Sequence, residues 1–116
     1  MDTGLSKIEI ITSFAKFTDL QKELGHLGVR GMTVSQVMGC GIQRGSAEYA
    51  IEENEEPVLL PKQQISLVVE TKNVRDIVEA VKQVLYTGHI GDGKIFVYSL
   101  DNVIKVRTGD EGVDAL

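Results

Sequence analysis

Residues 87–97 read TGHIGDGKIFV, which places three glycines, an acid and a base directly before an apolar run. The glycines let the backbone adopt left-handed conformations and approach a ligand closely. Successive backbone N–H groups in such a turn can form a nest for an anion. Lys94 adds a cation where a strand is expected to begin. The stretch therefore predicts either a polyphosphate-binding loop or an ordinary glycine-rich turn between a helix and a strand.

Hydrophobic periodicity around this stretch predicts two helices and five short strands. Helices are expected at residues 17–27 and 74–86, with Thr18 and Asn73 as their N-caps. Strands are expected at residues 5–12, 31–41, 64–70, 94–98 and 102–107. A polar and acidic connection spans residues 42–61, and an acidic tail spans residues 110–116. A connection of that length is typically functional or disordered, although a solvated acidic hairpin without a partner is the alternative.

The order of these elements predicts an α+β fold built from two β-α-β units. Such a doubled unit forms an antiparallel four-stranded sheet with two helices on one face, the ferredoxin-like arrangement. At 116 residues the chain is expected to be a single domain. The opposite sheet face, to which we assign Ile10, Val34 or their neighbours, has nothing in this chain to cover it. An uncovered apolar face predicts oligomerisation.

Composition excludes several classes of partner and site. A net charge of -5 and only 5% aromatic residues argue against nucleic-acid binding. No apolar run is long enough to span a bilayer, so direct membrane insertion is not expected. The single cysteine, Cys40, and two histidines predict neither an intrachain disulfide nor a zinc cluster. Together with an N-terminus that lacks a secretory pattern, these features predict a cytoplasmic protein.

Five phrases occur across nearly the whole chain in a recognisable order: GMTV at 31–34, GCGIQRG at 39–45, LPK at 60–62, the stretch at 87–97, and VRTG at 106–109. On these phrases the chain is similar to the PII family of nitrogen-regulatory signalling proteins. The resemblance implies a cytoplasmic homotrimer of ferredoxin-like subunits, each with a long T-loop at residues 42–61. It also implies ATP or ADP in the three clefts between subunits and regulation by docking onto target proteins. It does not imply an enzyme.

The resemblance also assigns a nucleotide site to this chain. The family's nucleotide-contacting positions are matched by Thr33, Gly39, Gly41, Thr87, Gly91, Asp92, Gly93, Lys94, Lys105 and Arg107. Lys94 is expected to pair with the phosphates, and Lys105 and Arg107 are expected to reach phosphates across a subunit boundary. Thr33 and residues 39–45 are expected on the same side of the cleft as the glycines. Lys105 stands where the family usually has arginine, so the bidentate fork of that contact is lost.

The base of the T-loop matches the family's effector site only in part. Many members bind 2-oxoglutarate with Mg-ATP; Gln43 matches their magnesium ligand, and Lys62 matches the residue that pairs with a carboxylate of the acid. The loop tip departs further, because Glu55 occupies the position of the family's modifiable tyrosine. The acidic residues 52–56 predict a target with a basic docking surface, either a membrane transporter or a cytoplasmic enzyme.

Two other function classes stay open at this point. One is a divergent PII-like sensor of ADP, AMP or another small anion that regulates a non-ammonium transporter and is not linked to nitrogen and 2-oxoglutarate. The other is an enzyme such as a slow ATPase. His89 in the loop has no evident carboxylate to orient it, which argues against catalysis. The function class that we favour is the PII-type regulator.

Overall fold

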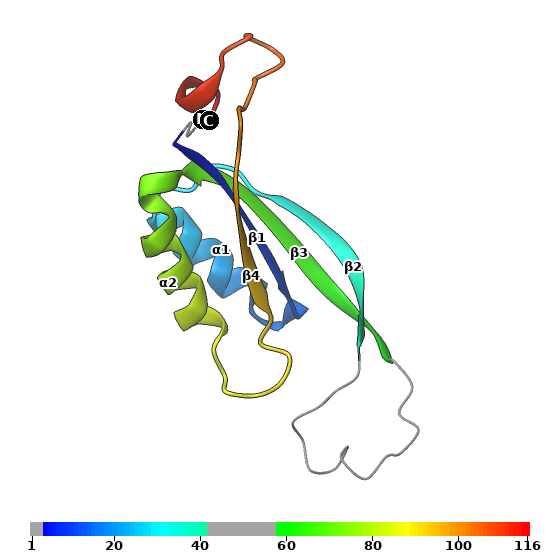
Figure 1. Cartoon of the computed structure of the whole chain (residues 1–116). Coiled ribbons are helices and arrows are strands. Elements are labelled where there is room, and N and C mark those ends of the chain that lie inside the picture. The colour runs from blue at the N-terminus through cyan, green and yellow to red at the C-terminus, as the bar shows by residue number, and fades with distance from the viewer. Residues whose placement is uncertain (1–3, 42–57) are drawn as a thin grey trace.

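The computed structural model describes residues 4–41 and 58–116, which form one sheet flanked by two helices (Figure 1). The strands are β1 (Leu5–Thr12), β2 (Thr33–Gly41), β3 (Val58–Glu70) and β4 (Lys94–Ser99). The helices are α1 (Phe17–His26) and α2 (Val74–Leu85), each preceded by a short 3₁₀ turn, Phe14–Lys16 and Thr71–Asn73. A third 3₁₀ turn, Gly112–Ala115, lies near the C-terminus.

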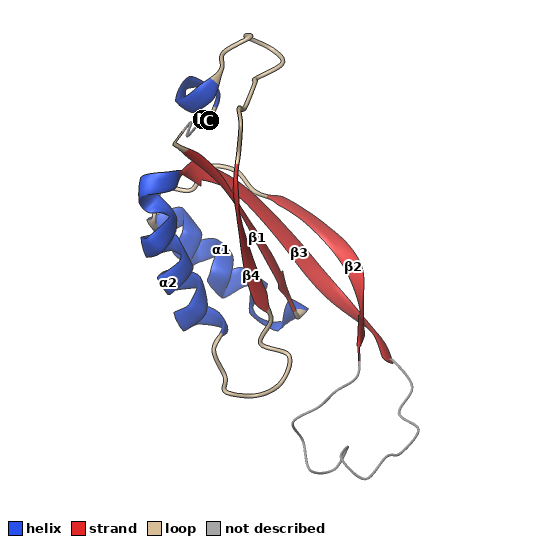
Figure 2. Cartoon of the chain, in the orientation of Figure 1, coloured by secondary structure: helices blue, strands red, loops and turns tan. Residues whose placement is uncertain are grey.

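The sheet has the strand order β2-β3-β1-β4, with every neighbouring pair antiparallel. Both helices lie on the same face of this sheet (Figure 2). The register places Ile10 of β1 opposite Ile65 of β3 and Ile95 of β4. This arrangement confirms the predicted α+β, ferredoxin-like fold.

The core lies between the sheet and the helices. Alternation along β1 and β3 turns every second side chain toward the helices, because successive side chains of a strand point to opposite faces. The buried cluster consists of Ile8, Ile10, Leu20, Leu24, Ile65, Leu67, Val69, Ile77, Val81 and Leu85. Full burial of one such side chain contributes roughly 1.5–3 kcal/mol, so this layer forms a rigid platform for the loops at the sheet's two ends.

The face of the sheet away from the helices, here called the open face, carries a mixed set of side chains. By register it includes Lys7, Glu9, Val68, Phe96 and Tyr98. Phe96 and Tyr98 are 39% and 44% exposed, so the prediction of an uncovered face is correct.

The residues that we assigned to the open face are wrong, however. Ile10 is fully buried in the core. Val34 is paired with Ile65 and therefore faces the helix side, yet it is 41% exposed. It lies on β2, an edge strand of the sheet, where a side chain on the helix side is still partly exposed.

The ends of α1 also differ from the prediction. Thr18 lies inside the helix, and the N-cap position is Lys16, because a 3₁₀ turn leads directly into Phe17. The helix passes through Gly25 and ends at His26. Gly28, with φ +82, lets the chain turn back, and the Val29 N–H donates to the Leu24 carbonyl at 3.0 Å. Asn73 does occupy the N-cap of α2, without a side-chain capping bond.

The predicted strand at residues 102–107 is absent from the described structure. In its place, the Lys105 N–H donates to the Asp110 carbonyl at 2.9 Å, and Ile104 forms a single bridge with Glu111. Asn102 closes this segment by donating from Nδ2 to the Glu111 carboxylate at 2.8 Å. The alternating apolar residues favoured a strand, but the segment pairs with itself instead of with the sheet.

The predicted connection at residues 42–61 is shorter than expected, because β3 begins at Val58. Residues 42–57 lie outside the described residues, and with them Gln43 and the acidic residues 52–56. No helix in the described part of the chain is long and apolar enough to cross a membrane.

Candidate functional site

The glycine-rich loop, residues 86–93, joins α2 to β4 and is closed by its own acidic residue. The Asp92 carboxylate accepts hydrogen bonds from the Thr87 hydroxyl, from the Thr87 N–H at 2.8 Å and from the Gly88 N–H at 3.1 Å. The Thr87 side-chain bond, followed by the Thr87 backbone bond, holds the pKa of Asp92 below its ordinary value. The first N–H groups of the predicted anion nest are therefore occupied by the loop's own carboxylate.

Two of the loop's glycines hold conformations that other residues rarely adopt. Gly91 and Gly93 have φ of +104 and +109. A Cβ on Gly93 would overlap the carbonyl oxygen of Ile11 and stand 3.0 Å from the Thr12 Cβ. Gly93 is therefore required both by its backbone angle and by its close approach to β1.

Two side chains from the junction of β1 and α1 attach the loop to the rest of the molecule. The Thr12 hydroxyl donates to the Asp92 carbonyl at 3.0 Å, at the loop's C-terminal end. Lys16 Nζ donates to the Val84 carbonyl at 3.1 Å, in the last turn of α2 before the loop begins. The loop is therefore held at both ends by residues about 70 to 80 positions earlier in the chain.

Three predicted site residues from different elements meet beside this loop. A Cβ on Gly39 of β2 would stand 3.2 Å from Lys62 Cγ, so the lysine stem passes over the bare glycine. The Lys62 ammonium then lies 3.9 Å from the point where Gly91 would carry a Cβ. By register, Lys62 shares the open face with Lys94. The structure thus brings two cations, Lys62 and Lys94, to the same side of the glycine-rich loop.

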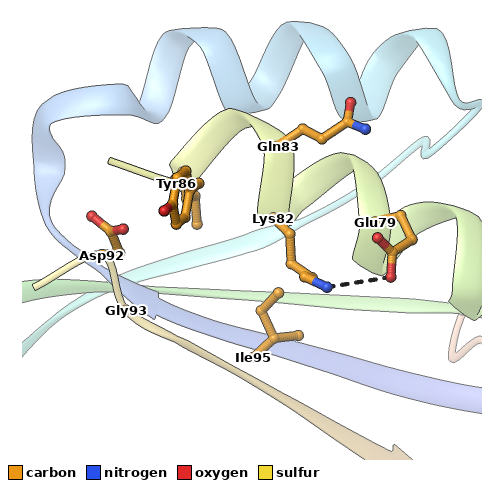
Figure 3. Close-up of a pocket in the computed structure, with 8 residues that line it drawn as sticks. Glu79, Lys82, Gln83, Tyr86, Asp92, Gly93 and Ile95 are labelled. Carbon is orange, nitrogen blue, oxygen red and sulfur yellow. Dashed lines mark hydrogen bonds and ion pairs between the residues drawn. The ribbon is translucent and has the colours of Figure 1, made fainter. Parts of the chain in front are cut away.

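A groove of about 520 Å³ lies on the other side of the loop, against α2 (Figure 3). Its walls include Tyr86, Lys82 and Gln83 of the helix side and Asp92, Gly93 and Ile95 of the loop and β4. It does not include Gly39, Lys62 or Lys94. The groove is therefore distinct from the cationic side of the loop.

Three further predicted site residues lie at the opposite end of the molecule. Thr33 begins β2 and lines a hollow of about 960 Å³ together with Arg30, Val103 and Leu116. Lys105 and Arg107 belong to the same C-terminal segment, which projects from the end of the sheet opposite the glycine-rich loop (Figure 1). The expectation that Thr33 stands with residues 39–45 is wrong for a single chain, because β2 carries Thr33 and Gly41 at its two ends.

The predicted site residues therefore fall into two separate groups, here called half-sites after the site that the sequence predicts. The first, half-site A, comprises Gly39, Lys62 and residues 87–94; the second, half-site B, comprises Thr33, Lys105 and Arg107. Gln43 lies outside the described residues, and Gly41 ends β2 beside that gap.

Sequence reasoning missed Thr12 and Lys16 as supports of the site. The signal for Thr12 was present, because Thr12 continues the inward-facing series Ile8, Ile10 with a hydroxyl in place of an aliphatic group. Lys16 carried no comparable signal, since its contact depends on how α1 and α2 pack.

The chain is thus a ferredoxin-like domain. The cationic residues of its predicted binding site are divided between the two ends of the chain. A family model described as nitrogen regulatory protein P-II matches residues 5–110. A nitrogen regulatory PII-like protein of Bacillus subtilis is 42% identical over 116 residues, covering 100% of both chains. A nitrogen regulatory protein P-II of Pasteurella multocida is 40% identical, covering 97% of this chain and 100% of the relative.

Solved structures agree with these relatives. A B. subtilis GlnK-ATP complex is 42% identical, with a TM-score of 0.84, covering 100% of this chain and 99% of the other. An Arabidopsis thaliana PII bound to citrate is 32% identical, with a TM-score of 0.79, covering 97% and 92%. The chain belongs to the P-II family of nitrogen regulatory proteins. Its relatives are named as regulatory proteins and not as enzymes, which confirms the expectation that this chain is a regulator.

Proposed function

We propose that this chain is a PII-type signalling protein that binds ATP or ADP between the subunits of a homotrimer. The observation that carries the proposal is the separation of the two half-sites. Half-site A and half-site B lie at opposite ends of one chain, so a second chain is needed to bring Lys94 and Arg107 onto one ligand. The solved GlnK-ATP complex, at 42% identity, supports an adenine nucleotide as that ligand.

The charges suit a polyphosphate. Lys62 and Lys94 are placed to attract phosphate oxygens from one wall of the cleft, and Lys105 and Arg107 from the other. Arg107 can offer two parallel N–H donors to a phosphate, whereas each lysine acts as a point charge. A closed ring of identical chains repeats this pairing at every boundary.

The ligands would act by changing which conformation of residues 42–57 is favoured. A ligand shifts such a balance only by its difference in affinity for the two states. ATP and ADP differ by a phosphate that Lys94 and Arg107 can detect, so the pair can report energy charge. Lys62 lies beside the glycine-rich loop and is the expected partner of a 2-oxoglutarate carboxylate.

Magnesium fits this site only as a companion of the nucleotide. No group of three or more His, Cys, Asp or Glu side chains gathers within residues 4–41 and 58–116. Magnesium is commonly held by substrate phosphates with few protein ligands, which is compatible with Gln43 as its protein contact.

The target is expected to carry a basic surface, because residues 52–56 are acidic. A membrane transporter and a cytoplasmic enzyme both satisfy this chemistry. The cytoplasmic location stays a prediction from the sequence. Pull-down from lysate with ATP and with ADP is the direct search for the target.

Calorimetry with ATP, ADP and AMP, each with and without 2-oxoglutarate and magnesium, tests ligand choice. We expect ATP and ADP to bind, and Lys94→Ala and Arg107→Ala each to weaken ATP by about tenfold or more, since each removes a charge-assisted bond. Lys72→Ala, which removes an exposed lysine paired with Glu70, is the matched control and should bind normally.

Mixed trimers test the shared cleft. Lys94→Ala and Arg107→Ala chains, co-refolded in equal amounts, should regain about a quarter of the wild-type sites, because that share of boundaries joins two intact halves. No recovery would place the site within one chain and reject the proposal. If ADP or AMP binds tightly and 2-oxoglutarate does not change that binding, the result would instead favour the alternative function, a divergent PII-like sensor that is not linked to nitrogen.

A further inference from the structure

The hydroxyl of Thr12 is one attachment of the glycine-rich loop to the sheet. Thr12 is the last residue of β1 and is 3% exposed. Its Oγ1 donates to the Asp92 carbonyl at 3.0 Å. The Asp92 side chain in turn holds Thr87 and Gly88. The Thr12 bond therefore fixes the residue around which the whole loop closes.

A second acceptor belongs to the residue that pairs with Thr12 across the sheet. Gln63 of β3 is directly opposite Thr12 in the register and faces the helix side with it. The Gln63 residue is 8% exposed, and its Oε1 is buried with no hydrogen-bond donor among the residues that the structure describes. Side chains directly opposite each other on antiparallel strands have Cβ atoms about 4.5–5.5 Å apart, within reach of a direct bond.

Thr12 cannot serve both acceptors at once. A threonine hydroxyl carries one proton, which it can direct by rotation, and a buried oxygen without a donor is unfavourable. In the observed state the Asp92 carbonyl receives that proton, and the Gln63 amide oxygen is left unpaired.

We infer that Thr12 is a positioning residue for the glycine-rich loop. We also infer that the Gln63 side chain competes with the Asp92 carbonyl for the hydroxyl proton of Thr12. This inference rests on the proposed nucleotide-binding function. Donation to Asp92 holds the loop in its closed form, and donation to Gln63 releases the loop while satisfying a buried oxygen.

Three variants separate these roles in the full-length protein without nucleotide. Thr12→Val keeps the shape and removes the hydroxyl, Thr12→Ser keeps the hydroxyl, and Gln63→Met removes the competing acceptor at similar length. The readout is amide hydrogen exchange in a peptide spanning residues 86–93, normalised to core amides of α1. We expect exchange to rise about fivefold in Thr12→Val, as for one lost hydrogen bond, and to stay near wild type in Thr12→Ser.

The competition itself is tested by the double variant. Gln63→Met should slow loop exchange and tighten ATP binding, but it should have no effect in a Thr12→Val background, because the contested proton is gone. An equal effect of Gln63→Met in both backgrounds would overturn the inference, as would unchanged loop exchange in Thr12→Val. Amide exchange is measured without ligand, so it reports on Thr12 and Gln63 whether or not the protein binds a nucleotide. A failure to bind any nucleotide would therefore reject the proposed function without affecting this test.

Discussion

The backbone of Gly93 packs directly against the carbonyl oxygen of Ile11, and no side chain fits between them. The contact joins the start of β4 to the end of β1 at the one point where the glycine-rich loop enters the sheet. A replacement must either move the loop or move the end of β1.

Gly93→Ala is therefore expected to destabilise the protein. The new Cβ would meet backbone atoms, and φ of +109 is unfavourable for alanine. We expect a loss of roughly 2–3 kcal/mol in the free energy of unfolding, measured in urea at fixed protein concentration. Gly109→Ala is the control, because Gly109 has φ of +77 but open space around it. Equal losses in the two variants would show that the contact with Ile11 contributes nothing beyond backbone strain.

The loop closure by Asp92 should depend on pH in a defined direction. Hydrogen bonds from Thr87 and Gly88 lower the pKa of Asp92 below its ordinary value of 3.8. A carboxylate with a lowered pKa stabilises the folded form above that ordinary value and loses this contribution as the pH falls through the lowered pKa. The amide signals of Thr87 and Gly88, followed by NMR, should therefore stay constant from neutral pH to about pH 4 and shift only below it.

Asp92→Asn provides the comparison for that titration. The amide signals of residues 87 and 88 should already be displaced at neutral pH and should show no acid transition. A transition of the wild-type signals well above pH 4 would contradict the closure described above.

Lys16 should stabilise the end of α2. Lys16→Met keeps the aliphatic stem and removes the donor to the Val84 carbonyl. We expect a loss of about 1 kcal/mol and faster amide exchange in residues 84–88, since one partly buried hydrogen bond is lost. Lys72→Met, which breaks an exposed pair with Glu70, should change stability by less than about 0.5 kcal/mol. Similar losses in both would assign the effect to general charge removal.

The open face should be the assembly surface of the proposed trimer. Phe96→Lys replaces an exposed aromatic side chain of that face with a charged one and should yield monomers in sedimentation velocity. Val97→Lys is the matched control, because Val97 is the next residue on the same strand and points to the helix side at 52% exposure. If the Phe96→Lys variant remains a trimer, the subunit interface must lie on another surface.

Much of this molecule could be predicted from local pattern. The stripe Ile77, Val81, Leu85 on α2 follows the helix period, and all three side chains are buried. On β1 the strand period was clear, but it did not show which face was the inward one, and Ile10 was assigned to the wrong face. The turn from α2 into β4 was also clear, because its glycines and Lys94 mark both its conformation and its end.

The errors arose where packing or pairing overrides local preference. Residues 102–107 have strand-like residues, but a strand needs a partner, and the chain instead folds back from Lys105 to Asp110. Val34 was assigned to the open face, but its pairing with Ile65 turns it to the helix side, where it is still 41% exposed on the edge strand β2. Thr12 and Lys16 depend on contacts with segments far away in the chain, which no local window contains.

The division of cationic groups between the two ends of the chain also determines how damage would spread through an assembly. In the proposed trimer, each protomer borders two clefts, and it offers Lys94 to one cleft and Arg107 to the other. A protomer altered at one end would disable one cleft, whereas a protomer altered at both ends would disable both of the clefts that it borders. Copies altered at one end would therefore reduce the number of intact clefts in proportion to their share, whereas copies altered at both ends would disable more clefts than their share of the protomers.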